Sequence, residues 1–327
     1  MAPRWYDLAL AFWTEHDDLL VRELREECAR RGADFFLVEP LWIDGFLQAY
    51  QAGRLGVGLL VDLASEPMEH GDAYLRLALT ARERGARVIN DTGHAARFSD
   101  KGVAHEALRA AGLPVPYGVA VSLAQAAARN LSAEERERLG VPFYVKPSHG
   151  FACRGVLSDG REMADIRRSH AIFPDTHYLL QRRVEIAEIA GRPAYWRVFH
   201  VLGEVHLCWW HPVTRHYSLV TAWQVGEYRL QELLELGRRL AVVTGLDLFS
   251  VEVARTPGGE FLLVDYVNDQ IDLRSQSYAH DGIPDELVRH VACRLAAAAE
   301  RELARRPADP VADVHRERLQ ASREANP

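Results

Sequence analysis

The sequence contains only four cysteines, Cys28, Cys153, Cys208 and Cys293, and they lie far apart. No C-x-x-C pair occurs, so neither a zinc motif nor a dithiol redox motif is indicated. Unpaired thiols are typical of the reducing cytoplasm. Long apolar runs are also missing: no stretch reaches the roughly 18 residues of a membrane span. The run Leu8–Trp13 is too short for a signal peptide. The sequence therefore predicts a cytoplasmic protein with no membrane partner.

An excess of positive charge is absent as well. The chain has 39 basic and 46 acidic residues, a formal net charge of −7. Nucleic-acid-binding proteins usually present a basic face, so we expect no nucleic-acid partner. A phosphate site needs only a few Lys or Arg and stays compatible with this charge. The length of 327 residues fits two or three domains of about 100–200 residues each.

The first hundred residues alternate between strand-like and helix-like patterns. Such alternation predicts a parallel sheet with helical crossovers, and ligands gather at the carboxyl ends of its strands. A continuous helix is expected next, followed by an extended link with two prolines. The expected strands are Asp7–Trp13, Phe35–Val38, Val57–Asp62 and Arg87–Asn90, and the expected helices are Asp17–Arg31, Ala73–Arg84 and His94–Ala111.

The rest of the chain is richer in strands. Tight turns are expected at Leu202–Glu204 and Thr256–Glu260. The expected strands are Val119–Val121, Phe143–Lys146, Tyr178–Gln181, Tyr195–Leu202, Glu204–Trp210, Leu248–Ala254 and Phe261–Val267, and the expected helices are Ala124–Leu139, Leu230–Thr244 and Asp285–Arg305.

Two lysines stand at positions suited to phosphate binding. Lys101 lies near the start of a predicted helix, whose N-terminus attracts anions, although a solvated lysine is the alternative. Lys146 ends an apolar strand, where a charge without a partner is costly. Gly150 and Gly155 follow it and would let backbone N–H groups approach phosphate oxygens. This glycine pair lacks both the P-loop and the dinucleotide signatures, so a simple hairpin tip is the alternative.

A third cluster lies in the last predicted hairpin, Leu248–Asp269. Glu252 stands inside an apolar strand, and Asp265 and Asn268 stand near the end of the next strand. Two carboxylates and an amide form an oxygen cage suited to Mg²⁺, with nucleotide phosphates completing the shell. Carboxylates buried together without a cation would repel each other strongly. Ordinary edge carboxylates are the alternative.

Together and in this order, the three clusters resemble the ATP-grasp superfamily, in particular its carboxylate–amine ligases, over roughly residues 90–269. Each motif is loose, but their joint order is fairly specific. The segments that match are Asn90, Asp100–Lys101, Gly112–Pro116, Pro142–Pro147, Gly150–Val156, Leu179–Gln181, Arg197–Val205, Gly245–Glu252 and Gly259–Asn268.

The resemblance implies a nucleotide site. Lys101 and Lys146 would contact the ATP phosphates, and Gln181 would meet the adenine edge. The backbone from Arg182 to Val184 would lie beside the base, and Glu188 would take the ribose hydroxyls. ATP is therefore the expected cofactor.

The resemblance also implies a metal and a phosphoryl-transfer group. Arg197 would face the transferred phosphoryl group and the developing acyl phosphate, while Glu252, Asp265 and Asn268 would bind Mg²⁺ or Mn²⁺. The family usually has Glu-x-Asn, whereas Asp265 and Asn268 are three residues apart. Strand alternation would send them to opposite faces unless a bulge intervenes. Asp269 is therefore a backup ligand.

A second departure follows the metal motif. The P-G of some amino-acid ligases is replaced here by D-Q-I-D-L-R-S-Q-S, which contains Arg274. The planar guanidinium of Arg274 suits bidentate pairing with a substrate carboxylate, although a plain surface arginine is the alternative.

The predicted architecture combines α/β and α+β parts in an ATP-grasp fold with an N-terminal Rossmann-like domain. That domain covers residues 1–95, and the central ATP-grasp subdomain covers 96–183. The C-terminal subdomain covers 184–305, and a polar tail covers 306–327. ATP would lie between the two ATP-grasp subdomains.

The predicted function is an ADP-producing ligase that forms an amide or peptide bond through an acyl phosphate. Its partners would be a small carboxylate and an amine, amino acids or peptide-like molecules. An ATP-grasp kinase acting on a hydroxyl and a non-catalytic nucleotide-binding module stay open. So do the substrates, the general base and the choice between monomer and homodimer. A Rossmann oxidoreductase is disfavoured because the glycine fingerprint is missing.

Overall fold

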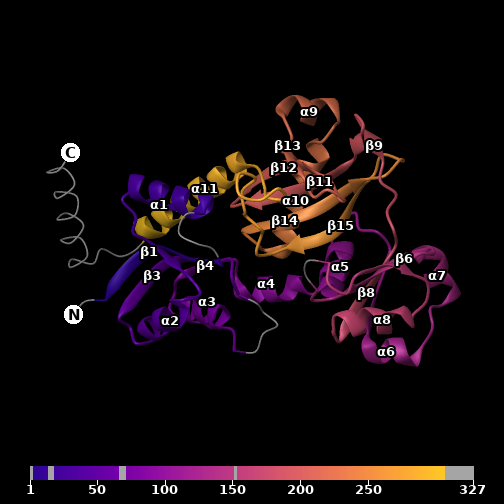
Figure 1. The fold of residues 1–327 in the computed structure, drawn as a ribbon, viewed down its shortest axis with the longest axis horizontal. Helices are drawn as coiled ribbons and strands as arrows, with labels where there is room; N and C mark the ends of the chain where they lie inside the picture. The colour runs from indigo at the N-terminus through magenta and orange to yellow at the C-terminus, as the bar shows by residue number, and fades with distance from the viewer. Residues whose placement is uncertain (1–2, 14–17, 66–70, 151–152, 306–327) are drawn as a thin grey trace.

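The computed structural model describes residues 3–13, 18–65, 71–150 and 153–305 (Figure 1). The tail predicted at 306–327 lies outside these ranges, as do Phe151 and Ala152 of the glycine-containing segment. The described chain forms three parts, each built on one sheet, together with one two-stranded ribbon. None of the described helices is long and apolar enough to cross a bilayer.

The N-terminal part is a parallel sheet in the order β2-β1-β3-β4, as the alternating pattern predicts. Apolar side chains on both faces explain the continuous hydrophobic run of the first strand. One helix of this part was not expected, although its buried positions follow a helical spacing: Ile43, Phe46, Leu47 and Tyr50. The elements are β1 (Arg4–Ala11), α1 (Leu19–Arg30), β2 (Phe35–Val38), α2 (Ile43–Gln51), β3 (Leu55–Asp62), α3 (Ala73–Glu83) and β4 (Arg87–Ile89).

The last helix of the chain, α11 (Asp285–Arg305), returns to the N-terminal part and lies beside α1 (Figure 1). Its buried Val288, Val291 and Leu295 share one apolar cluster with Leu20 and Leu24 of α1. The helix, which we placed within the subdomain at 184–305, therefore covers one face of the N-terminal sheet. The helices α2 and α3 cover the other face.

The central part contains a four-stranded antiparallel sheet in the order β5-β8-β6-β7. Two helices expected to be continuous are each broken in two. The helix expected at His94–Ala111 breaks at Asp100, which has an extended backbone and caps the second half by accepting from the N–H of Gly102 at 2.8 Å. The helix expected at Ala124–Leu139 likewise forms two short helices, each with its own capping box.

The central elements are α4 (Thr92–Ser99), α5 (Lys101–Ala110), β5 (Gly118–Ser122), α6 (Leu123–Ala128), α7 (Ala133–Leu139), β6 (Phe143–Pro147), β7 (Leu157–Gly160), α8 (Asp165–Ile172) and β8 (His177–Gln181). Of these, β7 and α8 were not expected. A short ribbon of β9 (Glu188–Ile189) and β10 (Arg192–Pro193) leads to the C-terminal part.

The C-terminal part is an antiparallel sheet in the order β13-β12-β11-β14-β15. The expected turn at Leu202–Glu204 is confirmed, with positive φ angles of 51° and 95° at Leu202 and Gly203. Helix α10 packs on β11 and β12. The elements are β11 (Tyr195–Val201), β12 (Glu204–Trp210), β13 (Tyr217–Leu219), α9 (Ala222–Glu227), α10 (Gln231–Thr244), β14 (Leu248–Arg255) and β15 (Phe261–Asn268), of which β13 and α9 were not expected.

Candidate functional site

A β-bulge between β14 and β15 groups the three predicted metal ligands. Glu252 pairs with Asp265 across the hairpin, and Ser250 pairs with Asn268. One residue therefore lies between the paired positions on β14, whereas two residues lie between them on β15. The Nδ2 of Asn268 donates to the carbonyl of Ser250 at 3.5 Å, and Asn268 also helps to lower the pKa of Asp265, so the shifted register keeps both residues near each other despite their spacing of three residues. The structure thus contains the irregularity that the departure from Glu-x-Asn requires.

The carboxylate of Glu252 is held by two side chains from the neighbouring strand β11. Arg197 is its direct cross-strand partner and forms an ion pair with it. The hydroxyl of Tyr195 donates to the second carboxylate oxygen at 2.6 Å. The Nε of Arg197 also donates to the Oγ of Ser250 at 3.1 Å. Tyr195 was missed from the sequence, although its position two residues before Arg197 on a strand puts both side chains on one face.

Lys146 joins the central sheet to this hairpin. Its Nζ donates to the backbone carbonyl of Val264 at 2.9 Å, next to Asp265, and the residue is only 9% exposed. Burial lowers the pKa of Lys146, and the nearby Asp265 carboxylate opposes that shift. Burial alone would raise the pKa of Asp265, but the charges of Lys146, Lys101 and Arg197 outweigh it and hold this pKa below its ordinary value. The lysine and the carboxylate therefore stabilise each other's charged forms.

Lys101 is the first residue of α5 and lies against the segment after β6. Its backbone N–H donates to the carbonyl of Ser148 at 2.9 Å, and its Nζ donates to the carbonyl of Gly150. Lys101 and Lys146 are the only lysines among the 39 basic residues of the chain. The scarcity of lysine is a sequence signal that could have indicated the site. All other basic residues of the chain are arginines, and the two lysines lie near enough for the charge of Lys101 to act on Lys146.

Gln181, at the end of β8, is fully buried beside the same hairpin. Its Nε2 donates to the hydroxyl of Tyr266 at 2.7 Å and to the carbonyl of Val264 at 3.3 Å. Tyr266 is also 2.6 Å from the Nδ1 of the buried His105. The Oε1 of Gln181 is buried and has no hydrogen-bond partner in the described structure, so an acceptor is left for a ligand. Tyr266 and His105 were missed, because neither belongs to a local motif.

The remaining nucleotide-site candidates lie along the segment that leaves β8. Arg182 is exposed and donates its backbone N–H to the carbonyl of Tyr117 at 2.8 Å. Val184 is partly buried, and Glu188 is exposed on β9. Among the described contacts, none joins these side chains to the acidic hairpin.

Arg274 and Asp269 are engaged elsewhere. Arg274 pairs with Asp272 at 2.6 Å and with Asp281 at 3.3 Å, both in its own loop. One oxygen of Asp269 accepts from the side chain of Asn90 at 2.6 Å and from the N–H of Gln270 at 2.9 Å. Asp269 thus helps to join β4 to the C-terminal sheet, and it does not take part in the Glu252–Asp265 pair.

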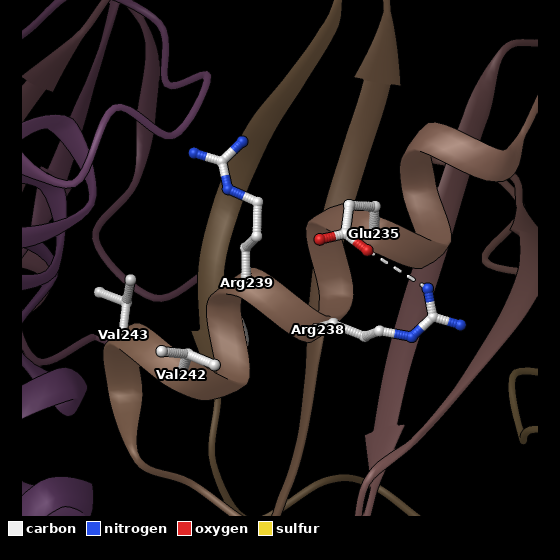
Figure 2. Close-up of a pocket in the computed structure, with 5 residues that line it drawn as sticks. All are labelled: Glu235, Arg238, Arg239, Val242 and Val243. Atoms are coloured by element: carbon white, nitrogen blue, oxygen red, sulfur yellow. Dashed lines mark hydrogen bonds and ion pairs between the residues drawn. The ribbon is translucent and has the colours of Figure 1, made fainter.

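A shallow depression on the exposed face of α10 is separate from these residues (Figure 2). Glu235 pairs there with Arg238 at 3.4 Å. Arg239 points away from that pair and donates to the carbonyl of Gly112 at 3.1 Å. Val242 and Val243 complete the lining of the depression. None of its lining residues is a site residue predicted from the sequence.

We call six side chains from the three predicted clusters the charge cluster: Lys101, Lys146, Arg197, Glu252, Asp265 and Asn268. Its carboxylates and amide offer the oxygen ligands that Mg²⁺ prefers. Its three cations, from α5, β6 and β11, suit the phosphate oxygens of a nucleotide. The donor set therefore fits a complex of ATP with a divalent cation.

No protein-family model matches the chain. The large chain of carbamoyl phosphate synthase from Beutenbergia cavernae is 34% identical over 146 residues, which cover 42% of this chain and 12% of that protein. The corresponding protein of Mycobacterium sp. is 30% identical over 167 residues, 47% of this chain and 14% of that protein. The chain thus matches less than a sixth of the length of these relatives.

Solved structures cover far more of the chain. The RimK domain ATP-grasp protein from Sphaerobacter thermophilus has a TM-score of 0.61 at 22% identity, over 89% of this chain and 98% of that one. D-alanine–D-alanine ligase from Bacillus anthracis, complexed with ATP, has a TM-score of 0.61 at 12% identity, over 90% and 98%. ATP-grasp ligase PsnB, complexed with a precursor peptide and AMPPNP, has a TM-score of 0.57 at 16% identity, over 90% and 99%.

Proposed function

We propose that this chain, which has the ATP-grasp fold, is an ATP-dependent ligase that joins a carboxylate to an amine and releases ADP. The observation that carries the proposal is the charge cluster. Its cations come from the central and the C-terminal parts of the chain, and the charges of Lys101, Lys146 and Arg197 all act on the carboxylate of Asp265. The ligases among the similar structures support the same reaction class.

In this proposal Glu252, Asp265 and Asn268 hold Mg²⁺ or Mn²⁺, which would neutralise charge on the phosphates. Lys101 and Lys146 bind phosphate oxygens as donors, and Arg197 faces the phosphoryl group that is transferred. Phosphoryl transfer needs mostly positioning and charge neutralisation, which these side chains can supply.

Gln181 would recognise the base. Its free Oε1 is an acceptor, and the exocyclic amino group of adenine is a donor. The backbone from Arg182 to Val184 would line the base, and Glu188 would take the ribose hydroxyls. These assignments favour ATP over GTP, which carries a carbonyl at the corresponding position.

The substrate carboxylate would attack the γ-phosphorus, forming an acyl phosphate and ADP. An amine would then attack the acyl carbon and displace phosphate, giving the amide. Holding both reactants together supplies proximity, and excluding water protects the intermediate. Arg274 is the proposed clamp for a substrate carboxylate, from an amino acid or a peptide-like molecule. In the present structure it is paired with Asp272 and Asp281, so it must exchange these partners to do so.

The presence of only two lysines gives a direct test of the nucleotide site. We would treat the full chain with an amine-reactive acylating reagent and measure modification of Lys101 and Lys146 by mass spectrometry. Mg·ATP should protect both, while the chain's N-terminal amine serves as an internal control. Equal modification of both lysines with and without Mg·ATP would contradict the proposed site.

ADP release over a panel of carboxylates tests the reaction. Added hydroxylamine should trap the acyl phosphate as a hydroxamate with the substrate carboxylate. A phosphorylated hydroxyl product without hydroxamate would show the kinase alternative. Lysine protection without ADP release from any substrate would favour a binding module that does not turn over.

A further inference from the structure

Away from the charge cluster, three potential metal ligands gather between β12 and α11: Glu204, His206 and His290. Glu204 and His206 are two residues apart on β12, so their side chains share one face of the sheet. His290 comes from α11, which brings its side chain to the same place. We call this group the His–Glu cluster.

The three ligand atoms lie at distances that suit one metal ion. The Oε2 of Glu204 is 2.7 Å from the Nε2 of His290 and 3.7 Å from the Nε2 of His206. All three atoms lie within 4.8 Å of one another. Tetrahedral ligands about 2.0–2.2 Å from Zn²⁺ are about 3.3–3.5 Å apart, which falls between the two observed distances. Small side-chain movements that lengthen the 2.7 Å contact and shorten the 3.7 Å one would bring both histidine nitrogens to ligand spacing from the carboxylate oxygen.

The Nε2 of His206 gives a second, independent reason to assign a ligand here. This atom is buried and has no hydrogen-bond partner in the described structure, because 3.7 Å is too long for one. Buried polar nitrogens normally have a partner, and leaving one unsatisfied destabilises the folded state. Its ring lies 4.4 Å from that of His290, so a single ion could bind both.

Arg294 orients the carboxylate without occupying the ligand position. Its guanidinium binds the other oxygen of Glu204 at 3.0 Å, and it also donates to the carbonyl of Leu202 at 3.1 Å. Oε2 is thereby turned toward the two imidazoles. A partner of this kind commonly fixes a metal-ligating side chain, although the positive charge of Arg294 also limits cation affinity.

We propose that Glu204, His206 and His290 form a binding site for a divalent transition metal such as Zn²⁺, separate from the nucleotide site. Imidazole ligands favour Zn²⁺, Ni²⁺ or Cu²⁺ over Mg²⁺ and Ca²⁺, which take oxygen ligands. Three protein ligands leave a fourth position for water or another ligand. The bound ion would join α11 to the β11–β12 hairpin and so fix the last helix against the C-terminal sheet.

Zinc binding to the full chain would be measured by competition with a chromogenic zinc indicator, in excess Mg²⁺ and without ATP. The wild type should bind one Zn²⁺ per chain at this site. His206→Gln and His290→Gln each remove a direct ligand, so each should weaken binding by at least the roughly 10–100-fold typical of losing a supporting partner. Equal affinity in the wild type and both variants, or no saturable binding to the wild type, would overturn the proposal.

The chain offers a matched control in a second histidine pair. His216 and His280 have ring centroids 5.6 Å apart, but no carboxylate completes a cluster with them among the described residues. His280→Gln should keep full zinc affinity. Zinc should raise the melting temperature of the wild type and of His280→Gln but not that of His290→Gln, because only a ligand of the folded state stabilises it. Equal zinc-dependent shifts in all three would contradict the site, and circular dichroism would verify that each variant is folded.

Discussion

The charge cluster and the His–Glu cluster both include residues of the C-terminal sheet, but they differ in chemistry and in surroundings. In the charge cluster, the side chains of Arg197 and Glu252 are only 12% and 14% exposed, and each charge has an opposite charge beside it. In the His–Glu cluster, Glu204 and His290 are 42% and 36% exposed. Oxygen ligands with cations around them suit a metal bound together with phosphates, whereas imidazoles suit a metal bound by protein alone. The donor atoms therefore distinguish the two proposed sites.

The largest expected effect separates the two clusters. Glu252→Gln removes a proposed Mg²⁺ ligand and the anionic partner of Arg197, so ADP release should fall by at least about 10²–10³-fold. Zinc affinity should not change, because Glu252 is not part of the His–Glu cluster. Glu260→Gln, an exposed position in the same hairpin, is the control and should keep full activity. Near-normal turnover in Glu252→Gln would rule out the metal assignment.

Lys146→Ala should mainly weaken nucleotide binding. A charge-assisted hydrogen bond contributes about 1.5–3 kcal/mol, or roughly 10–150-fold in Kd, and the variant loses one such bond to a phosphate oxygen. Binding of a fluorescent ATP analogue would measure this loss. Arg161→Ala, which removes a positive charge at an exposed position of the central part, is the control and should leave ATP affinity unchanged. Unchanged ATP affinity in Lys146→Ala would count against its role.

Tyr266→Phe should have a smaller effect on base recognition. The phenol holds the Nε2 of Gln181 at 2.7 Å, so its loss lets the amide rotate and present a donor instead of Oε1. We expect ATP affinity to fall by about two- to tenfold, the value of one neutral hydrogen bond, and the preference for ATP over GTP to narrow. Competition binding with both nucleotides would measure this. Tyr74→Phe, in the N-terminal part, is the control and should change the affinity for neither nucleotide. If Tyr266→Phe left the ratio of the ATP and GTP affinities unaltered, Tyr266 would not position the amide of Gln181.

The smallest expected effect is on stability and depends on pH. The hydrogen bond that the His149 ring donates to the carboxylate of Asp175 raises the pKa of His149, and its Nδ1 lies 3.2 Å from that carboxylate. Burial would raise the pKa of Asp175, but its hydrogen bonds with His149 lower it to about 2. The pKa of His149 is higher in the folded state than in the unfolded state. The stabilisation that its pair with Asp175 provides is therefore complete below about pH 6.5, and it is lost as the pH rises through the pKa of the folded state.

His149→Gln should therefore lower the melting temperature more at pH 6 than at pH 9. The expected difference is about 1 kcal/mol or less, as for a partly exposed ion pair. His177→Gln, at an exposed position on the same segment, should show no such pH dependence. Thermal unfolding of both variants at the two pH values measures this, and equal destabilisation by His149→Gln at both would show that its pair with Asp175 is not ionic.

Much of the fold follows from local patterns. Alternating apolar runs predict the parallel sheet and the two hairpins of the C-terminal part, and glycine marks the turn at Leu202–Glu204. The break at Asp100 was missed although Ser99 and Gly102 are weak helix formers and Asp is a preferred N-cap residue, so this signal was present in the sequence. Helix α2 was missed although its apolar spacing is regular, so that signal was present and unused.

The sequence by itself determined the chemistry of the charge cluster: which carboxylates, amide and cations the chain owns, and their order. It also required a bulge if Asp265 and Asn268 were to act together. Only the tertiary structure decided that the bulge exists, that Tyr195 supports Glu252, and that α11 returns to α1 and places His290 beside Glu204. Local patterns report which face of one element is apolar. They do not report which distant element covers that face, because this choice depends on the packing of the whole chain.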